Sequence, residues 1–468
     1  MKIVILLLSL FISNISLGAT PRTVFVQLFE WTWDDVAIEC EKNLGPNGYA
    51  AVQVSPPQEH VVWEKSPWWE RYQPISYKIF SRSGDEDQFK KMVSRCNRAG
   101  VDVYVDVVFN HMAGIDEGHG IAGTEFTHYS YPNLYSYNEF HHCGRNGNDN
   151  IVNFSDLYEL QFCELVNLAD LKTEAESVQN KIANYLNKLI GFGVKGFRVD
   201  AAKHIPAKDI KAITDKLIKP VYIVQELITS GGDPIDVDDY TKVGDVSAYA
   251  YPFIIGQAFK NRDFNLLARM QDYLPDSMDS VVFIDNHDLQ RSRDRSMLIS
   301  AQFDADVFDL AQIFMLTYPF GYPQLYSSYS FKDYDDGPPV NDQLMTLPVL
   351  NSNQECIAPF MCEHKRSYVN NLIAFRNNAD KNFFVTNWWT NGRDQLAFSR
   401  GNLGFVLINN SNTSINQSFQ TGLRAGLYCN LADIDTKSSK TNCSNPIRVD
   451  QNGVAKIYLE KMRAVVLQ

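Results

Sequence analysis

Residues 196–204 read GFRVDAAKH, and this stretch decides the fold. It begins as a short, largely apolar run and places a carboxylate, Asp200, at the end of that run. Such runs are typical of parallel strands buried on both faces of a sheet. Eight of them occur along the chain with helical stretches between them: residues 23–29, 49–55, 101–108, 196–201, 221–227, 246–251, 281–287 and 324–329. Apolar residues at helical spacing mark the helix before the fourth strand: Val178, Ile182, Leu186 and Leu189. Eight strand–helix units over this length predict a (β/α)8 TIM barrel.

Two segments depart from the strand–helix pattern. Residues 110–172 are rich in Gly, Asn, His and Tyr and show no clear helix until Glu174. Loops of this length are usually functional or form a small domain. After residue 385, short strand-like runs separated by Gly, Asn and Ser turns predict an antiparallel β-sandwich, with strands at 396–400, 404–409, 415–419, 426–430 and 455–459. We therefore predict a catalytic barrel at residues 20–109 and 173–385, an inserted subdomain B at 110–172 after the third strand, and a C-terminal all-β domain at 386–468.

The N-terminus predicts a secreted, extracellular protein. Lys2, the apolar residues 3–12 and the small residues near position 19 are typical of a signal peptide at 1–19. An uncleaved anchor is the alternative, although the apolar run is short for a membrane span. The net charge of −12 argues against nucleic-acid and anionic-membrane partners but does not bear on a neutral substrate such as a polysaccharide. We expect a soluble monomer.

The eight cysteines indicate disulfides, since their number is even and the chain has the start of a secreted protein. Their spacing leaves the pairing open among many connectivities. A zinc site is not supported, because no Cys-x-x-Cys pair occurs.

Three carboxylates stand at the ends of predicted strands: Asp200, Glu226 and Asp288. The rim formed by the C-terminal strand ends is where TIM-barrel enzymes carry their active sites. One such carboxylate alone would more often cap the next helix. Three on different strands favour catalysis, and the chemistry that needs them is glycosidic cleavage, in which one carboxylate attacks and a second donates a proton.

Arg198 lies two residues before Asp200 on the same predicted strand. Because side chains alternate along a strand, both should point into the barrel. A buried arginine needs a counter-charge, and its proximity would favour the ionised form of Asp200. An ordinary buried ion pair is the alternative interpretation.

Four blocks in order resemble those of the α-amylase family: DVVFNH at 106–111, GFRVDAAKH at 196–204, QE at 225–226 and FIDNHD at 283–288. The stretch WWERYQP at 68–74 is similar to the animal-type members in particular. The resemblance implies a retaining, endo-acting hydrolase of α-1,4 bonds in starch, glycogen and malto-oligosaccharides. It implies that Asp200 is the nucleophile, Glu226 the general acid/base and Asp288 the carboxylate that distorts the bound sugar.

The same resemblance implies the residues that contact substrate. Substrate contacts are expected from His111, Arg198, Lys203, His204 and His287, and a stacking platform from Trp68, Trp69 and Tyr72. Core packing is the alternative for the three aromatic residues.

The resemblance also implies two ions. A structural calcium would be held by Asn110, Asp170 and the backbone carbonyls of Gln161 and His204, and oxygen ligands of this kind suit a hard cation. Gln161 stands where relatives carry arginine, which leaves a backbone ligand intact. The alternative is that Asn110 merely forms a turn.

A chloride in activated relatives is held by residues that match Arg198 and Asn286 and by a basic residue just after the eighth strand. Ser330 occupies that third position, and Lys332 is close. We therefore predict weak or absent chloride activation.

The resemblance further implies the disulfide pairs Cys40–Cys96, Cys143–Cys163, Cys356–Cys362 and Cys429–Cys443. Residues 292–296 (SRDRS) contain no glycine where relatives carry a mobile glycine-rich loop, so loop closure is expected to differ.

Competing functions remain at this point. An α-glucosidase or a transglycosylase of the same superfamily would share the three carboxylates, and only the stretch at 68–74 favours an endo-acting amylase. A non-enzymatic carbohydrate-binding relative would be expected to lack one of the carboxylates.

Overall fold

The computed structural model describes residues 23–229, 232–433, 443 and 445–468. The predicted signal peptide lies outside the described residues. Among the residues that are described, no helix is long and apolar enough to cross a membrane.

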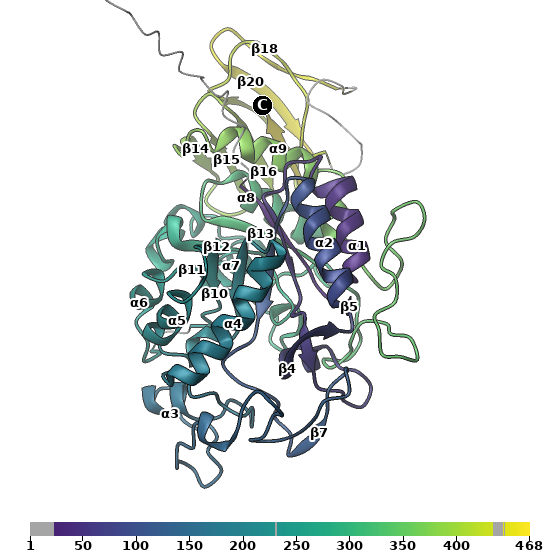
Figure 1. The fold of residues 1–468 in the computed structure, drawn as a ribbon. Coiled ribbons are helices and arrows are strands. Elements are labelled where there is room, and N and C mark those ends of the chain that lie inside the picture. Colours follow the sequence, from purple (N-terminus) through teal and green to yellow (C-terminus); the bar gives the residue numbers. More distant parts are fainter. Residues whose placement is uncertain (1–22, 230–231, 434–442, 444) are drawn as a thin grey trace, which may run out of the picture.

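Eight parallel strands close into a barrel in the order β1-β13-β12-β11-β10-β9-β6-β2 (Figure 1). Their bounds are β1 (Phe25–Leu28), β2 (Ala51–Val54), β6 (Asp102–Val107), β9 (Gly196–Val199), β10 (Tyr222–Gln225), β11 (Asp245–Ser247), β12 (Ser280–Val282) and β13 (Tyr322–Ser327). Each strand overlaps one of the eight predicted runs, and the predicted barrel is confirmed.

The strand register decides which side chains share the barrel interior. Arg198 of β9 lies opposite Asp106 of β6 and Val224 of β10. Val224 belongs to a small core that closes one part of the interior together with Phe25, Ala51, Tyr104 and Val281. Towards the carboxyl ends of the strands the same face becomes polar, and this places charged groups where the barrel opens.

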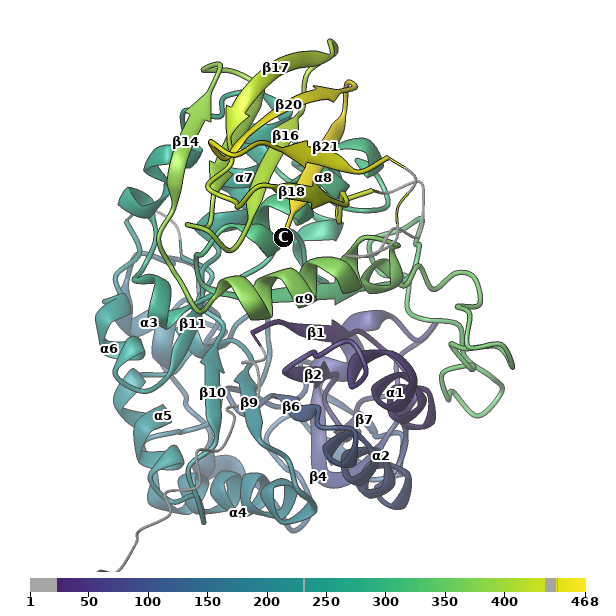
Figure 2. The ribbon, with the colours of Figure 1, turned by 90° about the horizontal axis from the view of Figure 1, so that it is seen from above.

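Helices surround the barrel strands (Figures 1 and 2): α1 (Trp33–Glu39), α2 (Glu86–Arg98), α4 (Glu176–Phe192), α5 (Ala207–Thr214), α6 (Val237–Thr241), α7 (Ala250–Lys260), α8 (Ala305–Thr317) and α9 (Val369–Ala379). The predicted apolar face of α4 is buried as expected. This helix ends at Gly193, whose φ of 109° lies in the left-handed region that favours glycine at a helix C-terminus.

The predicted sixth strand was too long. β11 ends at Ser247, and helix α7 begins at Ala250, within the run of residues assigned to the strand. Pro252 lies in the first turn of α7, a position that tolerates the missing N–H of proline. The proline was the signal that a helix starts here.

Residues 110–172 contain more regular structure than the sequence indicated. They form a small sheet of β7 (Glu117–His119) and β8 (Glu125–Thr127) and a short helix, α3 (Leu157–Phe162). The side chain of Asp156 caps α3 by accepting hydrogen bonds from the backbone of Tyr158 and Glu159. This helix was not predicted because it is short. The subdomain boundaries themselves remain a prediction.

A second small sheet follows β2 and was not predicted. It consists of β3 (Gln58–His60), β4 (Pro74–Ser81) and β5 (Gly84–Asp85), and the 3-10 turn Trp68–Tyr72 lies between β3 and β4. This sheet positions the WWERYQP stretch beside the barrel.

The C-terminal part is all-β and antiparallel, as predicted. One sheet has the order β14-β15-β16-β21 and the other β17-β20-β19-β18. The bounds are β14 (Thr386–Thr390), β15 (Gln395–Ser399), β16 (Phe405–Asn409), β17 (Ile415–Gln420), β18 (Gly426–Tyr428), β19 (Ile447–Val449), β20 (Val454–Leu459) and β21 (Arg463–Leu467). Buried side chains from both sheets share one core. β14, β19 and β21 were missed. Figure 2 shows α9 between this part and β1.

All four disulfide pairs are confirmed: Cys40–Cys96, Cys143–Cys163, Cys356–Cys362 and Cys429–Cys443.

Candidate active site

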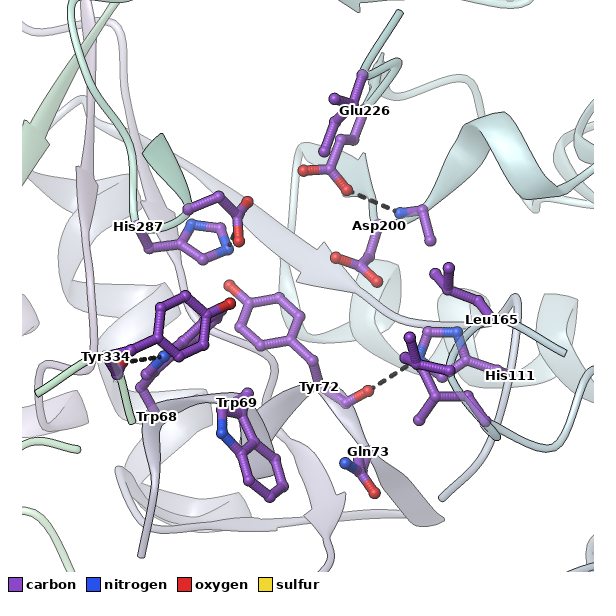
Figure 3. A pocket seen from close by; sticks show the side chains of 15 residues that line it. Trp68, Trp69, Tyr72, Gln73, His111, Leu165, Asp200, Glu226, His287 and Tyr334 are labelled. Atoms are coloured by element: carbon purple, nitrogen blue, oxygen red, sulfur yellow. Dashed lines mark hydrogen bonds and ion pairs between the residues drawn. The ribbon is translucent and has the colours of Figure 1, made fainter. Parts of the chain in front are cut away.

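A cavity of about 400 Å³ lies at the carboxyl ends of the barrel strands. Its lining includes all three predicted carboxylates and five of the predicted substrate contacts: Trp68, Trp69, Tyr72, His111 and His287. Figure 3 shows Trp68, Trp69 and Tyr334 on one side of the cavity and Leu165 and His111 on the other. The fold therefore brings together residues that lie more than 200 positions apart in the chain.

The three carboxylates reach the cavity from three different strands. Asp200 follows β9 and Glu226 follows β10, and both are buried. Asp288 follows β12 after a short connection, and its side chain is 31% exposed. Two carboxylates therefore lie deep in the site, and the third stands nearer its opening.

Arg198 joins the deep carboxylates beneath the cavity floor. Its Nη1 donates to Asp106 and to Asp200, at 2.7 Å in each case, and its Nη2 donates to Glu226. The predicted proximity of Arg198 to Asp200 is confirmed. Arg198 does not line the cavity, so in this structure it contacts carboxylates rather than the space for a ligand.

Glu226 accepts two further hydrogen bonds that the sequence analysis missed. The Tyr249 hydroxyl donates to its Oε1 at 2.7 Å, and the backbone N–H of Ala201 donates to its Oε2 at 2.9 Å. The Asn286 amide in turn donates to the Tyr249 hydroxyl at 2.8 Å. No pattern in the sequence pointed to Tyr249, because the predicted sixth strand included it, whereas β11 ends at Ser247.

Burial dominates the charge state of this cluster. Burial raises the pKa of Asp200 well above its ordinary value, and Arg198 acts in the opposite direction. The pKa of Asp288 is raised to about 7 by burial and by the neighbouring Glu226. Burial likewise raises the pKa of Asp106. Burial therefore disfavours the ionised forms of Asp106, Asp200 and Asp288, and the Arg198 guanidinium opposes this effect.

The two histidines in the cavity are neutral at ordinary pH. Burial lowers the pKa of His111 to about 4 and that of His287 well below its usual value. Gln27 donates to Nδ1 of His287, so its Nε2 carries the proton and faces Asp288 at 3.4 Å. Both ring nitrogens of His111 are already bonded, to the Asn110 amide at 3.1 Å and to the Tyr72 carbonyl at 2.9 Å, so the neutral Nε2–H of His287 is the imidazole donor closest to Asp288.

The three aromatic residues expected to form a stacking platform, Trp68, Trp69 and Tyr72, are more buried than a flat exposed platform would be. Trp68 and Tyr72 are 5% and 8% exposed, and the Tyr72 ring stacks on His287 at 5.0 Å between centroids. The Trp69 ring is partly exposed, and its indole N–H donates to Asp335 at 2.8 Å. Only Trp69 thus offers a substantial open ring among the three.

Lys203 and His204 do not line the cavity. The Lys203 ammonium pairs with Asp233 at 2.7 Å, and the His204 ring bonds to the Leu160 carbonyl at 2.9 Å. Residues that line the cavity and were not predicted are Gln73, Leu165, Val166, Leu168, Ala201, Ile228 and Tyr334. Those at 165–168 come from the inserted segment, where no sequence pattern pointed to them.

The residues expected to hold calcium fit a cation. The Asn110 amide nitrogen lies 3.1 Å from Nδ1 of His111, which leaves the amide oxygen available. Asp170 is buried. Within the described part of the chain, no hydrogen bond ends on the carbonyl oxygen of Gln161 or of His204. Among the described residues, no group of three or more His, Cys, Asp and Glu side chains is arranged so that it could hold a metal ion.

The residues expected to hold chloride do not fit an anion here. Both terminal nitrogens of Arg198 donate to carboxylates, and the Asn286 amide donates to Tyr249. Ser330 and Lys332 are exposed. No step of the chemistry is derived through chloride.

Comparison with known proteins decides the family. The model of the α-amylase catalytic domain matches residues 68–228, and that of the α-amylase C-terminal all-β domain matches residues 385–468. The chain is 40% identical to an α-amylase of Pecten maximus, covering 93% of this chain and 90% of that protein. It is also 40% identical to pancreatic α-amylase 2a5 of Mus musculus, with 93% and 91% covered.

The chain belongs to the α-amylase family.

Solved structures agree with this assignment. Wild-type α-amylase I from Eisenia fetida superposes with a TM-score of 0.90 at 35% identity, covering 96% of this chain and 97% of that one. A variant of the same enzyme in complex with maltohexaose gives a TM-score of 0.89. A γ-CGTase from Bacillus clarkii gives 0.67 at 20% identity, which shows the shared fold alone. The α-amylase family member described here is a glycoside hydrolase that cleaves internal bonds of starch.

Proposed function

We propose that this α-amylase hydrolyses α-1,4 bonds with retention of configuration, with Asp200 as nucleophile and Glu226 as general acid/base. The observation that carries the proposal is the single guanidinium, Arg198, that contacts both carboxylates. One arginine that holds both groups keeps them at fixed positions on one side of the cavity. Retaining glycosidases need their two carboxyl groups close together, at about 5–5.5 Å.

The steps follow from the positions of the side chains. Glu226 donates its proton to the leaving glycosidic oxygen while an Asp200 oxygen attacks the anomeric carbon. This breaks the glycosidic bond and forms a glycosyl ester on Asp200. Glu226 then takes a proton from water, whose oxygen attacks the same carbon and releases Asp200. Asp288, beside His287 near the opening, is placed to orient the sugar that carries the reacting carbon.

We propose linear α-1,4-glucans as substrates: starch, glycogen and malto-oligosaccharides. The maltohexaose complex of the Eisenia fetida relative supports oligosaccharide binding. The partly exposed Trp69 supplies an apolar ring face, on which the C–H face of a pyranose packs. His287 supplies a neutral N–H beside Asp288, and His111 lines the cavity with both ring nitrogens bonded within the protein.

We further propose that calcium is held by Asn110, Asp170 and the carbonyls of Gln161 and His204. Bound there, the ion would tie the inserted segment to the barrel, because Asn110 follows β6, Asp170 lies in the inserted segment and His204 follows β9. The four disulfides support the proposal that the enzyme is secreted. We also propose that it is a monomer.

Glu226→Gln tests the acid role. The amide cannot donate a proton to the leaving oxygen, so starch hydrolysis should fall by roughly 10²–10⁴-fold, the usual contribution of general acid–base catalysis. A malto-oligosaccharide with a good leaving group, such as 2,4-dinitrophenyl, needs no proton in the first step, so the variant should release the phenol in a burst at a rate much closer to that of the wild type. Turnover after the burst should stay slow, because the second step needs Glu226 as a base. A first step slowed equally on both substrates would refute the role of Glu226 as the acid.

A further inference from the structure

An aromatic side chain at the rim of the cavity has no part in the proposed mechanism. Trp63 lies in the connection after β3, is 37% exposed, and does not line the cavity itself. Its ring is 5.1 Å from that of Trp69 between centroids, at an interplanar angle of 70°. Because Trp69 does line the cavity, the two indoles form a continuous aromatic surface from the cavity to its outside.

The connection that carries Trp63 is firmly anchored. The backbone N–H of Trp63 donates to Oε2 of Glu70 at 3.1 Å. Glu70 is buried and forms an ion pair with the equally buried Arg82. Arg82 also donates to the carbonyl of Ser66 at 3.3 Å. The exposed tryptophan therefore stands on a buried ionic network that fixes its backbone.

The backbone of this connection is also strained. Lys65 and Ser66 have φ angles of 66° and 46°, in the region that side chains other than glycine rarely adopt. Such strain persists where the surroundings impose it and is concentrated at functional sites. Here the strained turn closes directly behind Trp63, since the backbone N–H of Ser66 donates to the Trp63 carbonyl at 3.1 Å.

A third ring, that of Tyr334, lies 6.0 Å from the ring of Trp68 between centroids. Tyr334 lines the cavity and is 51% exposed. Its carbonyl accepts the indole N–H of Trp68 at 2.9 Å, and the next residue, Asp335, accepts that of Trp69 at 2.8 Å. We call Trp63, Trp69 and Tyr334 the aromatic rim.

We propose that the aromatic rim forms an outer sugar-binding subsite in which Trp63 holds a glucose unit beyond the cavity. The inference rests on the proposed function and names the part of that site that selects long substrates. A pyranose presents an apolar C–H face that packs on an exposed indole. Within the described part of the chain, no group accepts a hydrogen bond from the Trp63 indole N–H, which is therefore available to a sugar hydroxyl.

The proposal predicts a dependence on chain length. A short substrate that fills the cavity does not reach Trp63, whereas a long one does. Trp63→Ala should lower kcat/KM for maltoheptaose and amylose by about tenfold, which corresponds to about 1.4 kcal/mol. Chromogenic maltotriosides should be cleaved within about twofold of the wild-type rate.

Three controls make the comparison specific. Trp63→Phe keeps a ring and should restore most of the activity on long chains. Phe384→Ala removes another exposed aromatic side chain, 77% exposed and outside the rim, and should leave both substrates unaffected. The melting temperature of each variant establishes that the fold is intact.

Direct binding separates this inference from the proposed function. In a Glu226→Gln background, calorimetry should show about tenfold weaker binding of maltoheptaose after Trp63→Ala and unchanged binding of maltotriose. Equal losses for both lengths, or no loss for either, would overturn the proposed subsite. A wild-type protein that fails to cleave starch would instead contradict the proposed function, and the binding measurement would still decide the role of Trp63.

Discussion

Arg198→Met tests the charge balance on which the site depends. The substitution keeps an unbranched side chain but removes the guanidinium that contacts Asp106, Asp200 and Glu226. Arg198 is 5% exposed, so the three carboxyl groups would stay buried without a counter-charge. Removal of one partner of a buried ion pair costs about 3–5 kcal/mol. An unfolding entropy of about 2.1 cal/mol/K per residue gives about 1 °C per kcal/mol for a chain of this size, so the melting temperature should fall by roughly 3–5 °C at pH 7.

The same argument fixes the pH dependence. Burial already raises the pKa of Asp106 and of Asp200 in the folded protein, and loss of Arg198 removes the main opposing influence. A carboxyl group whose folded pKa lies above its unfolded value contributes stability that is fully present below an unfolded pKa of about 4. That stability is lost as the pH rises through the folded pKa. The melting temperatures of wild type and variant should therefore approach each other at pH 4 and separate towards pH 7.

Thermal unfolding from pH 4 to pH 8 measures this effect. Arg198→Lys is the control, because lysine keeps the positive charge but lacks the two terminal nitrogens with which the guanidinium contacts several carboxyl groups at once. The lysine variant should be destabilised less than the methionine variant at pH 7. If Arg198→Met lowers the melting temperature equally at pH 4 and pH 7, lost packing rather than uncompensated charge is the cause, and the reasoning fails.

Three further predictions follow from the contacts of the site. Chelation of calcium should lower the melting temperature and speed proteolysis within residues 110–172. The reason is that a ligand present at about 1,000 times its Kd stabilises the folded state by about 4 kcal/mol. Identical thermal unfolding curves for calcium-loaded and calcium-free protein would count against the metal site. Sodium chloride added to a chloride-free buffer at pH 7 should change activity no more than sodium nitrate or sulfate does, because Ser330 carries no charge and Lys332 is exposed. A several-fold rise that saturates at millimolar chloride would show this to be wrong. Tyr249→Phe removes the hydrogen bond to the buried carboxyl group of Glu226, which is worth about 1.5–3 kcal/mol. The substitution should lower kcat by at least tenfold with little change in KM. An unchanged kcat would mean that the contact with Glu226 serves packing only.

The barrel and the positions of its acidic residues could be predicted because they depend on local patterns. Each strand is a short apolar run, and Asp200 and Glu226 come directly after such runs. Alternation along one strand was enough to place Arg198 beside Asp200. The disulfide pairs, by contrast, followed from the family resemblance and not from the spacing of the cysteines.

The rest of the site depends on contacts between distant segments. The bond from Asn286 to Tyr249 joins residues 37 positions apart, and the bond from Tyr249 to Glu226 joins residues 23 apart. Leu165 and Val166 reach the cavity from an irregular segment without periodicity. The burial of Trp68 could not be predicted from the sequence either, because three of the rings around it come from distant segments, at Phe29, His287 and Tyr334.

The central claim is that Asp200 forms a covalent bond with the substrate. A fluorinated maltosyl substrate with a good leaving group slows hydrolysis of the glycosyl ester and lets it accumulate in the wild-type enzyme, and in Glu226→Gln if turnover is still too fast. Mass spectrometry of the digested protein should then find one maltosyl unit on the peptide that contains Asp200, and none in Asp200→Asn. A label on Glu226 or Asp288 instead, or no adduct together with products of inverted configuration, would contradict the account.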